Sequence, residues 1–498
     1  MSALREPVLA GAFFGAQCAD TAERLAAFAG LGKHDALRAW FGDAAALLAA
    51  RPDALGGALD RDIAAIDVLI GAQLDAILHH PRMARLEGSW RGLAWLADGI
   101  EPASRVRVKV LNAAWPDLCR DLERAAEFDQ SYLFRKIYEE EFGTPGGEPY
   151  GLLVIDHEAR HRPAPGQPTD DVAAIAALAG IAAAAFAPTV LTAAPALLQA
   201  DAFTDLALAT NLSDPFRGPE YARWRAVAGR EDMRFVAVAM PRVLARPPWE
   251  DDPARADGFR YAETALQPSD RVWMGAGYAF AAVAARAFAH SAWPADVRGT
   301  DLDRVGGGLV TDLPPEPFRT DPDHVCVRPS LEIVLTDRQE RALVDAGLMP
   351  LGALPFGEEA AFGAVRSVQA LPRLAGPAAA DGPALANARL SAQLNAILCA
   401  SRFAHYVKVM GRDMVGAFRT AEEIERQLQA WLSGYVNASL TAGPESRARY
   451  PLVAARATVR EKAGRPGVFG CVIQLQPHYQ LDNVAGSFRL VTDIAGVQ

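Results

Sequence analysis

The chain has 498 residues, enough for two to four domains with sizeable hydrophobic cores. Its residues are 51% hydrophobic and 22% charged, an ordinary composition for a soluble globular protein. The net charge of −10 argues against binding to nucleic acid or to an anionic membrane. The five cysteines are scattered without a C-x-x-C pair, which argues against a zinc ribbon or a disulfide scaffold and indicates a reducing compartment. We therefore expect a cytoplasmic protein.

Two apolar stretches could imitate targeting signals. Residues 8–16 lie near the N-terminus, but the run is short and follows a glutamate and a proline, so we do not expect a signal peptide. Residues 172–198 carry no charge and are long enough to span a bilayer. Because this stretch is mostly alanine and is interrupted by Pro188 and Pro195, we expect a buried helix followed by an extended segment, without membrane insertion.

The first part of the chain is predicted to be helical. Residues 1–58 are alanine-rich with weak helical patterning, and residues 60–80 form a helix that Pro81 ends. The next helix carries Gly88 and Gly92 four residues apart, which leaves room for another element to approach closely. The apolar stripe of the 60–80 helix consists of Ile63, Ile66, Leu69, Ile70, Leu74, Ile77 and Leu78.

A short basic segment follows these helices. Residues 105–111 (RVRVKVL) alternate valine with arginine or lysine, which predicts a half-buried strand. Its basic face is either solvated or directed toward an acidic partner surface.

The remainder of the chain is organised around residues 127–156. They predict a helix, a glycine-rich turn that the Gly-Pro-Gly-Gly residues allow, and a strand over 151–155 that is buried on both faces. A second buried strand is predicted over 235–240. The sequence thus predicts an α/β body.

The last part of the chain predicts a smaller helix-and-sheet domain. Residues 372–383 are rich in proline and glycine and form the predicted linker. Helices are expected to begin at Leu390 and near Ile424. Three strands follow, over Leu452–Glu461, Val468–Gln476 and Val484–Asp493. The last of these could pair with a neighbouring chain as readily as with its own.

Several runs resemble the large subunit of the type VI secretion contractile sheath, the TssC/VipB family. The resemblance covers roughly residues 59–493 and depends on the order and spacing of the runs rather than on a single motif. The runs are LDAILHH (74–80), LEGSWRGL (86–93), FDQS (128–131), IYEEEFGT (137–144), GGEPYG (146–151), PR (241–242), RFAHYVK (402–408) and QPH (476–478).

This resemblance implies a mixed α/β and α+β protein with a contractile tail-sheath-like fold. The expected parts are an N-terminal arm or helical segment over residues 1–58, a central α/β body over 59–371, a linker over 372–383 and a C-terminal sheath domain over 384–498. Its function would be structural rather than enzymatic and would need no cofactor. The subunit would polymerise into a helical tube that contracts to deliver effectors.

The resemblance also implies the partners. They are a small sheath subunit of the TssB/VipA type, further copies of this chain, the hexameric inner-tube protein, the baseplate and a AAA+ recycling ATPase of the ClpV type. The terminal strand would link protomers. The residues that we expect at this inter-protomer strand are Val484, Phe488, Leu490 and Val491.

One motif suggests a different class of function. His157-Glu158-Ala159-Arg160-His161 satisfies H-E-x-x-H, so the alternative is a cytosolic zinc-dependent hydrolase. Zinc chemistry requires this spacing on a helix, where both imidazoles share one face. The motif here follows a strand and runs into a proline-rich stretch, so we expect a loop without a metal site.

Overall fold

The structure is a computed structural model. It describes residues 4–13, 18–144, 146–209, 211–300, 304–319, 321, 325–354, 358–371, 391–414, 420–439, 441–461, 469–478 and 488–494. The chain divides into two compact units. The first comprises Met1–Glu87 and Arg246–Val272, and the second comprises Gly88–Ala245 and Trp273–Gln498.

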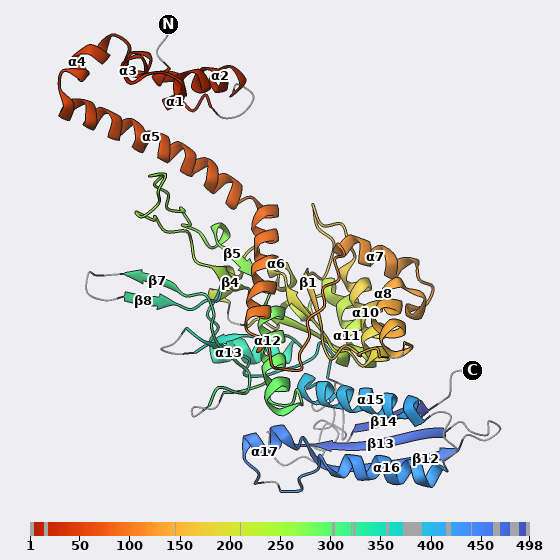
Figure 1. The fold of residues 1–498 in the computed structure, drawn as a ribbon. Coiled ribbons are helices and arrows are strands. Elements are labelled where there is room, and N and C mark those ends of the chain that lie inside the picture. The colour runs from red at the N-terminus through yellow and green to blue at the C-terminus, as the bar shows by residue number, and fades with distance from the viewer. Residues whose placement is uncertain are drawn as a thin grey trace. The chain divides into compact units, whose positions relative to one another are not determined.

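A parallel sheet lies at the centre of the second unit (Figure 1). Its strand order is β1-β2-β3-β9, and Thr189 of β2 lies opposite Leu153 of β1 and Val236 of β3. The central strands β2 and β3 are fully buried, as the sequence predicts for residues 235–240. The edge strand β1 is only partly buried, so the prediction that it is buried on both faces is wrong. The strands are β1 (Leu153–Ala159), β2 (Thr189–Ala193), β3 (Val236–Met240) and β9 (Met349–Pro350).

Helices α10 (Asp171–Ala185) and α12 (Ala276–Ser291) cover opposite faces of this sheet. The Asp170 carboxylate caps α10 by accepting a hydrogen bond from the Ala173 N–H at 3.2 Å. Leu191 of β2 belongs to the core that α10 enters, whereas its neighbour Val190 faces α12. The uncharged stretch over 172–198 is therefore a buried helix followed by a strand, as predicted.

The segment before β1 forms one interrupted helix. It runs through α8 (Tyr132–Phe134), a π-helical turn over Arg135–Glu139, and α9 (Glu140–Phe142). The following turn requires glycine, because a Cβ on Gly147 would lie 2.3 Å from the Glu141 carbonyl oxygen. The predicted helix, glycine turn and strand are therefore present.

Helix α6 (Pro81–Asp98) packs closely within the second unit through its glycines. A Cβ on Gly88 would lie 2.1 Å from the Trp273 carbonyl oxygen, and one on Gly92 would lie 2.7 Å from the Tyr278 ring. The prediction that these glycines admit a close neighbour is confirmed. Other elements of the body are α7 (Trp115–Arg124), α11 (Ala222–Ala228), α13 (Asp337–Asp345), β4 (Val243–Arg246), β5 (Val272–Met274), β6 (Leu309–Val310), the hairpin β7 (Glu316–Arg319) and β8 (Val325–Arg328), β10 (Gly352–Ala353) and β11 (Ala360–Ala361).

The C-terminal part is an antiparallel sheet packed with helices (Figure 1). The strand order is β12-β13-β14, and α15 and α16 supply Phe403, Leu428 and Leu432 to the core between them and the sheet. The three strands lie where the sequence predicts them, and the predicted linker 372–383 lies outside the described residues. The elements are α15 (Leu394–Met414), α16 (Ala421–Ser433), α17 (Pro444–Arg449), β12 (Leu452–Glu461), β13 (Phe469–Pro477) and β14 (Phe488–Ile494).

The first unit consists of a small N-terminal helical subdomain, the long helix α5 (Pro52–Leu78), the start of α6 and residues 246–272. The core of the N-terminal subdomain consists of Leu4, Val8 and Trp40. Asp62 of α5 is 4% exposed and accepts hydrogen bonds from the Arg5 guanidinium at 2.6 and 2.7 Å and from the Trp40 indole at 2.9 Å. The N-terminal helices are α1 (Arg5–Leu9), α2 (Cys18–Ala29), α3 (Lys33–Phe41) and α4 (Ala45–Ala49).

Within the described residues, no single helix is both long and apolar enough to cross a bilayer. Helices α5 and α6 satisfy the length and composition requirements only as a pair, and that pair is bent by 72°.

Candidate assembly surfaces

The predicted linking strand is an edge strand of the C-terminal sheet. β14 pairs antiparallel with β13, with Phe488 opposite Leu475, Leu490 opposite Ile473 and Val491 opposite Val472. Val484 lies outside the described residues. Because β14 is last in the strand order, its other edge has no strand partner among the described residues.

An edge of this kind presents a row of backbone N–H and C=O groups that a further strand can pair with. The opposite edge of the sheet, at β12, is already engaged, because Leu452 pairs with Val436 and the Gln429 side chain of α16 accepts a hydrogen bond from the Ala457 N–H at 2.9 Å. Pairing of β14 with β13 inside one chain leaves the outer edge of β14 available for a further strand.

Residues 105–111 form a second surface with strand character. The predicted half-buried strand is wrong for the chain alone, because the segment belongs to no sheet and Val110 is 63% exposed. Residues 105–110 make no backbone hydrogen bond to any part of the chain that the structure describes. An alternating segment with an unpaired backbone has the features of a strand whose partner lies in another chain.

The basic side chains of this segment pair with acids of the same chain. Arg107 lies 2.7 Å from Glu148, and the Lys109 amine donates to Glu141 at 2.5 Å. The hydrogen bond to Glu141 raises the pKa of Lys109. Burial favours a neutral Glu141 carboxyl, but the hydrogen bonds from Lys109 and from the Glu148 N–H outweigh it and lower the pKa of Glu141. These two bases therefore have acidic partners within the chain.

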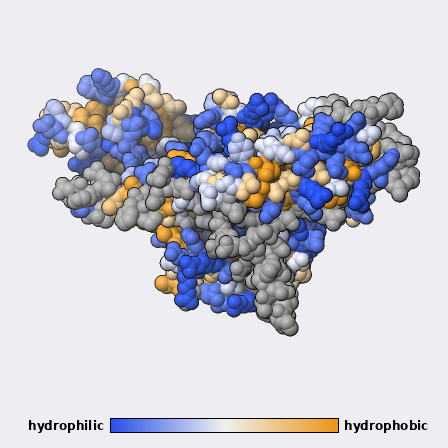
Figure 2. Space-filling view, turned by 90° about the horizontal axis from the view of Figure 1, so that it is seen from below, coloured by the Kyte–Doolittle hydropathy of each residue, from blue (hydrophilic) through white to orange (hydrophobic). Residues whose placement is uncertain are grey.

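Helix α5 provides a third surface. The structure confirms a helix with an apolar stripe. The stripe is not fully buried within this chain, because the buried residues of α5 are Ala58 and Asp62. Val68 is 71% exposed and Ile63 52% exposed. Exposed apolar residues gather in separate groups on other parts of the surface too (Figure 2). Most of the rest of the stripe is half-buried, so α5 exposes part of its apolar surface, which is a feature of protein–protein contacts.

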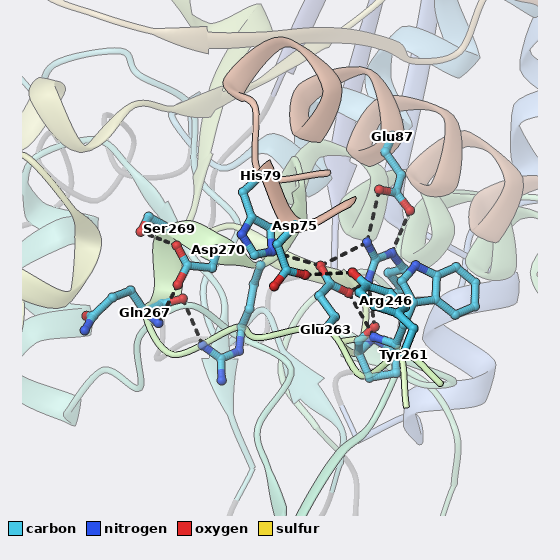
Figure 3. A network of polar contacts seen from close by, with 12 residues as sticks. Asp75, His79, Glu87, Arg246, Tyr261, Glu263, Gln267, Ser269 and Asp270 are labelled. Atoms are coloured by element: carbon cyan, nitrogen blue, oxygen red, sulfur yellow. Dashed lines mark hydrogen bonds and ion pairs between the residues drawn. The ribbon is translucent and has the colours of Figure 1, made fainter. Parts of the chain in front are cut away.

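A buried ion network holds the C-terminal end of α5 and the start of α6 to residues 246–272 (Figure 3). The Arg246 guanidinium lies 2.6 Å from Glu87 and 2.5 Å from Glu263. His79 lies 3.1 Å from Glu263, and the Tyr261 hydroxyl donates to Asp75 at 2.7 Å. Burial alone would lower the pKa of Arg246, but its bonds to the two glutamates raise it. Arg246 is thus held in its charged form.

The H-E-x-x-H run lies on β1 and the residues after it, not on a helix. His157 lies 2.9 Å from Asp171 and stacks on Trp115 with ring centroids 4.3 Å apart. His161 stacks instead on Tyr221 at 4.2 Å, and burial lowers its pKa. No group of three or more His, Cys, Asp or Glu side chains suited to a metal is present in the described part of the chain. Both histidines therefore act as packing residues.

Comparisons with known proteins agree with this architecture. Two family models match, described as "EvpB/VC_A0108, tail sheath N-terminal domain" over residues 60–369 and "EvpB/VC_A0108, tail sheath gpW/gp25-like domain" over 383–494. The chain is also 36% identical over 438 residues to the type VI secretion system sheath protein TssC1 of Pseudomonas aeruginosa, covering 87% of this chain and 85% of that protein. The chain belongs to the type VI secretion sheath large-subunit family. It is a structural subunit and not an enzyme, so the alternative of a zinc hydrolase is rejected.

Sequence reasoning missed two features of this sheath subunit. The first is the contact of Asp62 with Arg5 and Trp40, for which an aspartate beside the apolar stripe of α5 was a usable signal. The second is the Arg246 network, whose members come from positions 75 to 263. No local pattern joins residues so distant in sequence.

Proposed function

We propose that this chain pairs with a small sheath subunit and polymerises with it into a helical tube around an inner tube. Contraction of that tube in the cytoplasm would drive effector delivery. Sheath family membership supports the pairing and the polymer. The proposal extends to the hexameric inner-tube protein, the baseplate and a AAA+ recycling ATPase as further partners.

The observation that carries the pairing is the unpaired backbone of residues 105–110. The exposed backbone and alternating side chains of this segment fit addition to a sheet edge of the small subunit. Main-chain hydrogen bonds would supply affinity, and Val106, Val108 and Val110 would contribute the apolar face. The exposed stripe of α5 is a second surface for the same partner.

Linkage along the tube is proposed for the terminal strand that was predicted from the sequence, through Val484, which lies outside the described residues, and through Phe488, Leu490 and Val491 of β14. A strand near the end of the chain can pair with a neighbouring protomer while a sheet edge remains available to receive another. Backbone pairing should tolerate rotation of the joined bodies better than a packed interface does, because main-chain hydrogen bonds depend on the register of two strands and not on the shape of the surfaces around them. This would allow protomers to stay joined during contraction.

A proline scan of residues 106–110 tests the pairing with the small subunit. Proline removes a backbone N–H, and in a strand successive N–H groups point to opposite sides, so only alternate positions should matter. We expect copurification with the small subunit to fall with a period of two along the segment. Val108→Thr, which keeps the backbone donor, serves as the matched control. Uniform copurification across all five proline variants would refute this pairing.

A further inference from the structure

A basic cavity lies in the second unit, beside the glycine-rich loop that follows α12. It encloses about 300 Å³, and its lining includes Arg298 from this loop and Arg447 from α17. Gly299, Gly307 and Gly363 also line it, so much of its wall is backbone. A space of this size is at the lower end of the range for small-ligand sites.

Among the described residues, the two arginines that line the cavity have no acidic partner. Neither Arg298 nor Arg447 makes an ion pair with any residue that the structure describes, although both are partly buried. Burial lowers the pKa of Arg298, and no acid counteracts this. The Arg447 Nε is buried without a hydrogen-bond acceptor. Charges withdrawn from water in this way are costly unless an anion joins them.

The acid nearest to these arginines is already engaged. Asp296 is the one carboxylate among the described residues of the lining. Its Oδ2 accepts hydrogen bonds from Arg304 at 2.7 Å and from the Gly307 N–H at 3.1 Å. Arg286 lies behind this pair and donates to the Gly307 carbonyl at 3.0 Å, which adds a further positive charge. The surroundings of the cavity thus hold more guanidinium groups than carboxylates.

A smaller cavity of about 40 Å³ adjoins the first and shares Asp296 and Arg447 with it. Two of its lining atoms, His478 Nε2 and Asn395 Oδ1, are buried without hydrogen-bond partners. Such atoms are normally satisfied by water or by a ligand.

We propose that this cavity is a binding site for an oxyanion, a carboxylate or phosphate group that Arg298 and Arg447 hold from two sides. The planar guanidinium matches both groups with two parallel hydrogen bonds. The anion is either free in solution or a carboxylate of a neighbouring sheath chain. A carboxylate from a neighbouring chain requires the proposed polymer, whereas binding of an oxyanion by the two arginines does not.

The test uses the full chain copurified with its small subunit and kept unassembled. Binding of radiolabelled inorganic phosphate is measured by equilibrium dialysis, with sodium chloride holding the ionic strength constant. We expect saturable binding that Arg298→Gln and Arg447→Gln each weaken by roughly tenfold, as loss of a charge-assisted pair predicts. Arg298→Lys should weaken it less. Arg449→Gln, an exposed position on the same helix, should leave binding unchanged.

Repeating the measurement on assembled tubes identifies the source of the anion. Tubes that bind phosphate as the unassembled complex does indicate a free anion, and tubes that no longer bind it indicate a neighbouring carboxylate. Absence of saturable binding, or binding that both glutamine variants retain, would overturn the proposal. Failure of tube assembly leaves the first measurement intact.

Discussion

At the scale of single residues, buried polar groups in this sheath subunit hold segments that are distant in sequence. Arg246 is 5% exposed and joins Glu87 and Glu263, which are 159 and 17 residues away. His405 is 1% exposed and contacts the Ala185 carbonyl oxygen at 3.0 Å, so it joins α15 to the end of α10. Because these groups are buried, water cannot replace a partner that is removed. Removing a partner should therefore lower the stability measurably.

Replacing Arg246 with methionine should destabilise the first unit strongly. The change leaves the Glu87 and Glu263 carboxylates buried without their cation, a situation that typically costs about 3–5 kcal/mol. Hydrogen exchange over residues 60–80 measures the local free energy of opening. The control is Arg255→Met in the same segment, whose pair with Asp257 is exposed and should give no measurable change. Equal effects of the two substitutions would contradict the stabilising role of the network.

The buried imidazole of His405 should make the stability of the chain depend on pH. Burial lowers its pKa to about 4, so the folded chain holds it neutral while the unfolded chain binds a proton below its ordinary pKa of 6.5. The unfolded state therefore binds more protons between these two values, and stability should fall by up to roughly 3 kcal/mol as the pH drops from 6.5 to 4. His405→Gln keeps a donor for Ala185 but cannot titrate. Urea unfolding of both proteins at several pH values checks this, and parallel profiles would contradict it.

At the scale of elements, sequence patterns predicted where helices and strands lie better than they predicted what each element packs against. The alanine-rich helix α10, the buried strand β3 and the three C-terminal strands lie where periodicity and turn residues place them. The failures concern partners. The segment 105–111 has a strand pattern but belongs to no sheet, and the stripe of α5 has a helical pattern but is only partly buried. Hydrophobic periodicity indicates which face of an element is suited to burial. It does not indicate whether the element that covers this face belongs to the same chain.

The glycines of two helices give a matched test at this scale. Gly88→Ala places a Cβ 2.1 Å from a backbone oxygen, which cannot move aside as a side chain can, so we expect a loss of about 1–3 kcal/mol or more. Gly56→Ala in α5 meets no atom within 4 Å and should gain about 0.5–1 kcal/mol from helix propensity. Chemical denaturation of both variants measures these changes in the free energy of unfolding. A Gly88→Ala protein as stable as the wild type would exclude the close packing of α6.

At the scale of the whole molecule, the sequence identified the family and its structural class but not the working surfaces. The resemblance depends on runs distributed from residue 74 to residue 478, and the two tail-sheath matches, over residues 60–369 and 383–494, include all of these runs. The unpaired backbone of 105–110 and the basic cavity at Arg298 become visible only when hydrogen bonds and burial are known. In both places, polar groups of the chain have no partner among the described residues. Such groups are expected in a subunit whose partners belong to other chains.

The central claim is that strands shared between chains carry the mechanical function. Its most direct test is electron microscopy of the chain coexpressed with a small sheath subunit, as the full-length protein and as a truncation after residue 483 that removes β14. Copurification of the truncated chain with the small subunit verifies that it still folds. We predict tubes for the full-length pair and only unassembled complexes for the truncated pair. Intact tubes built from the truncated chain would contradict the claim.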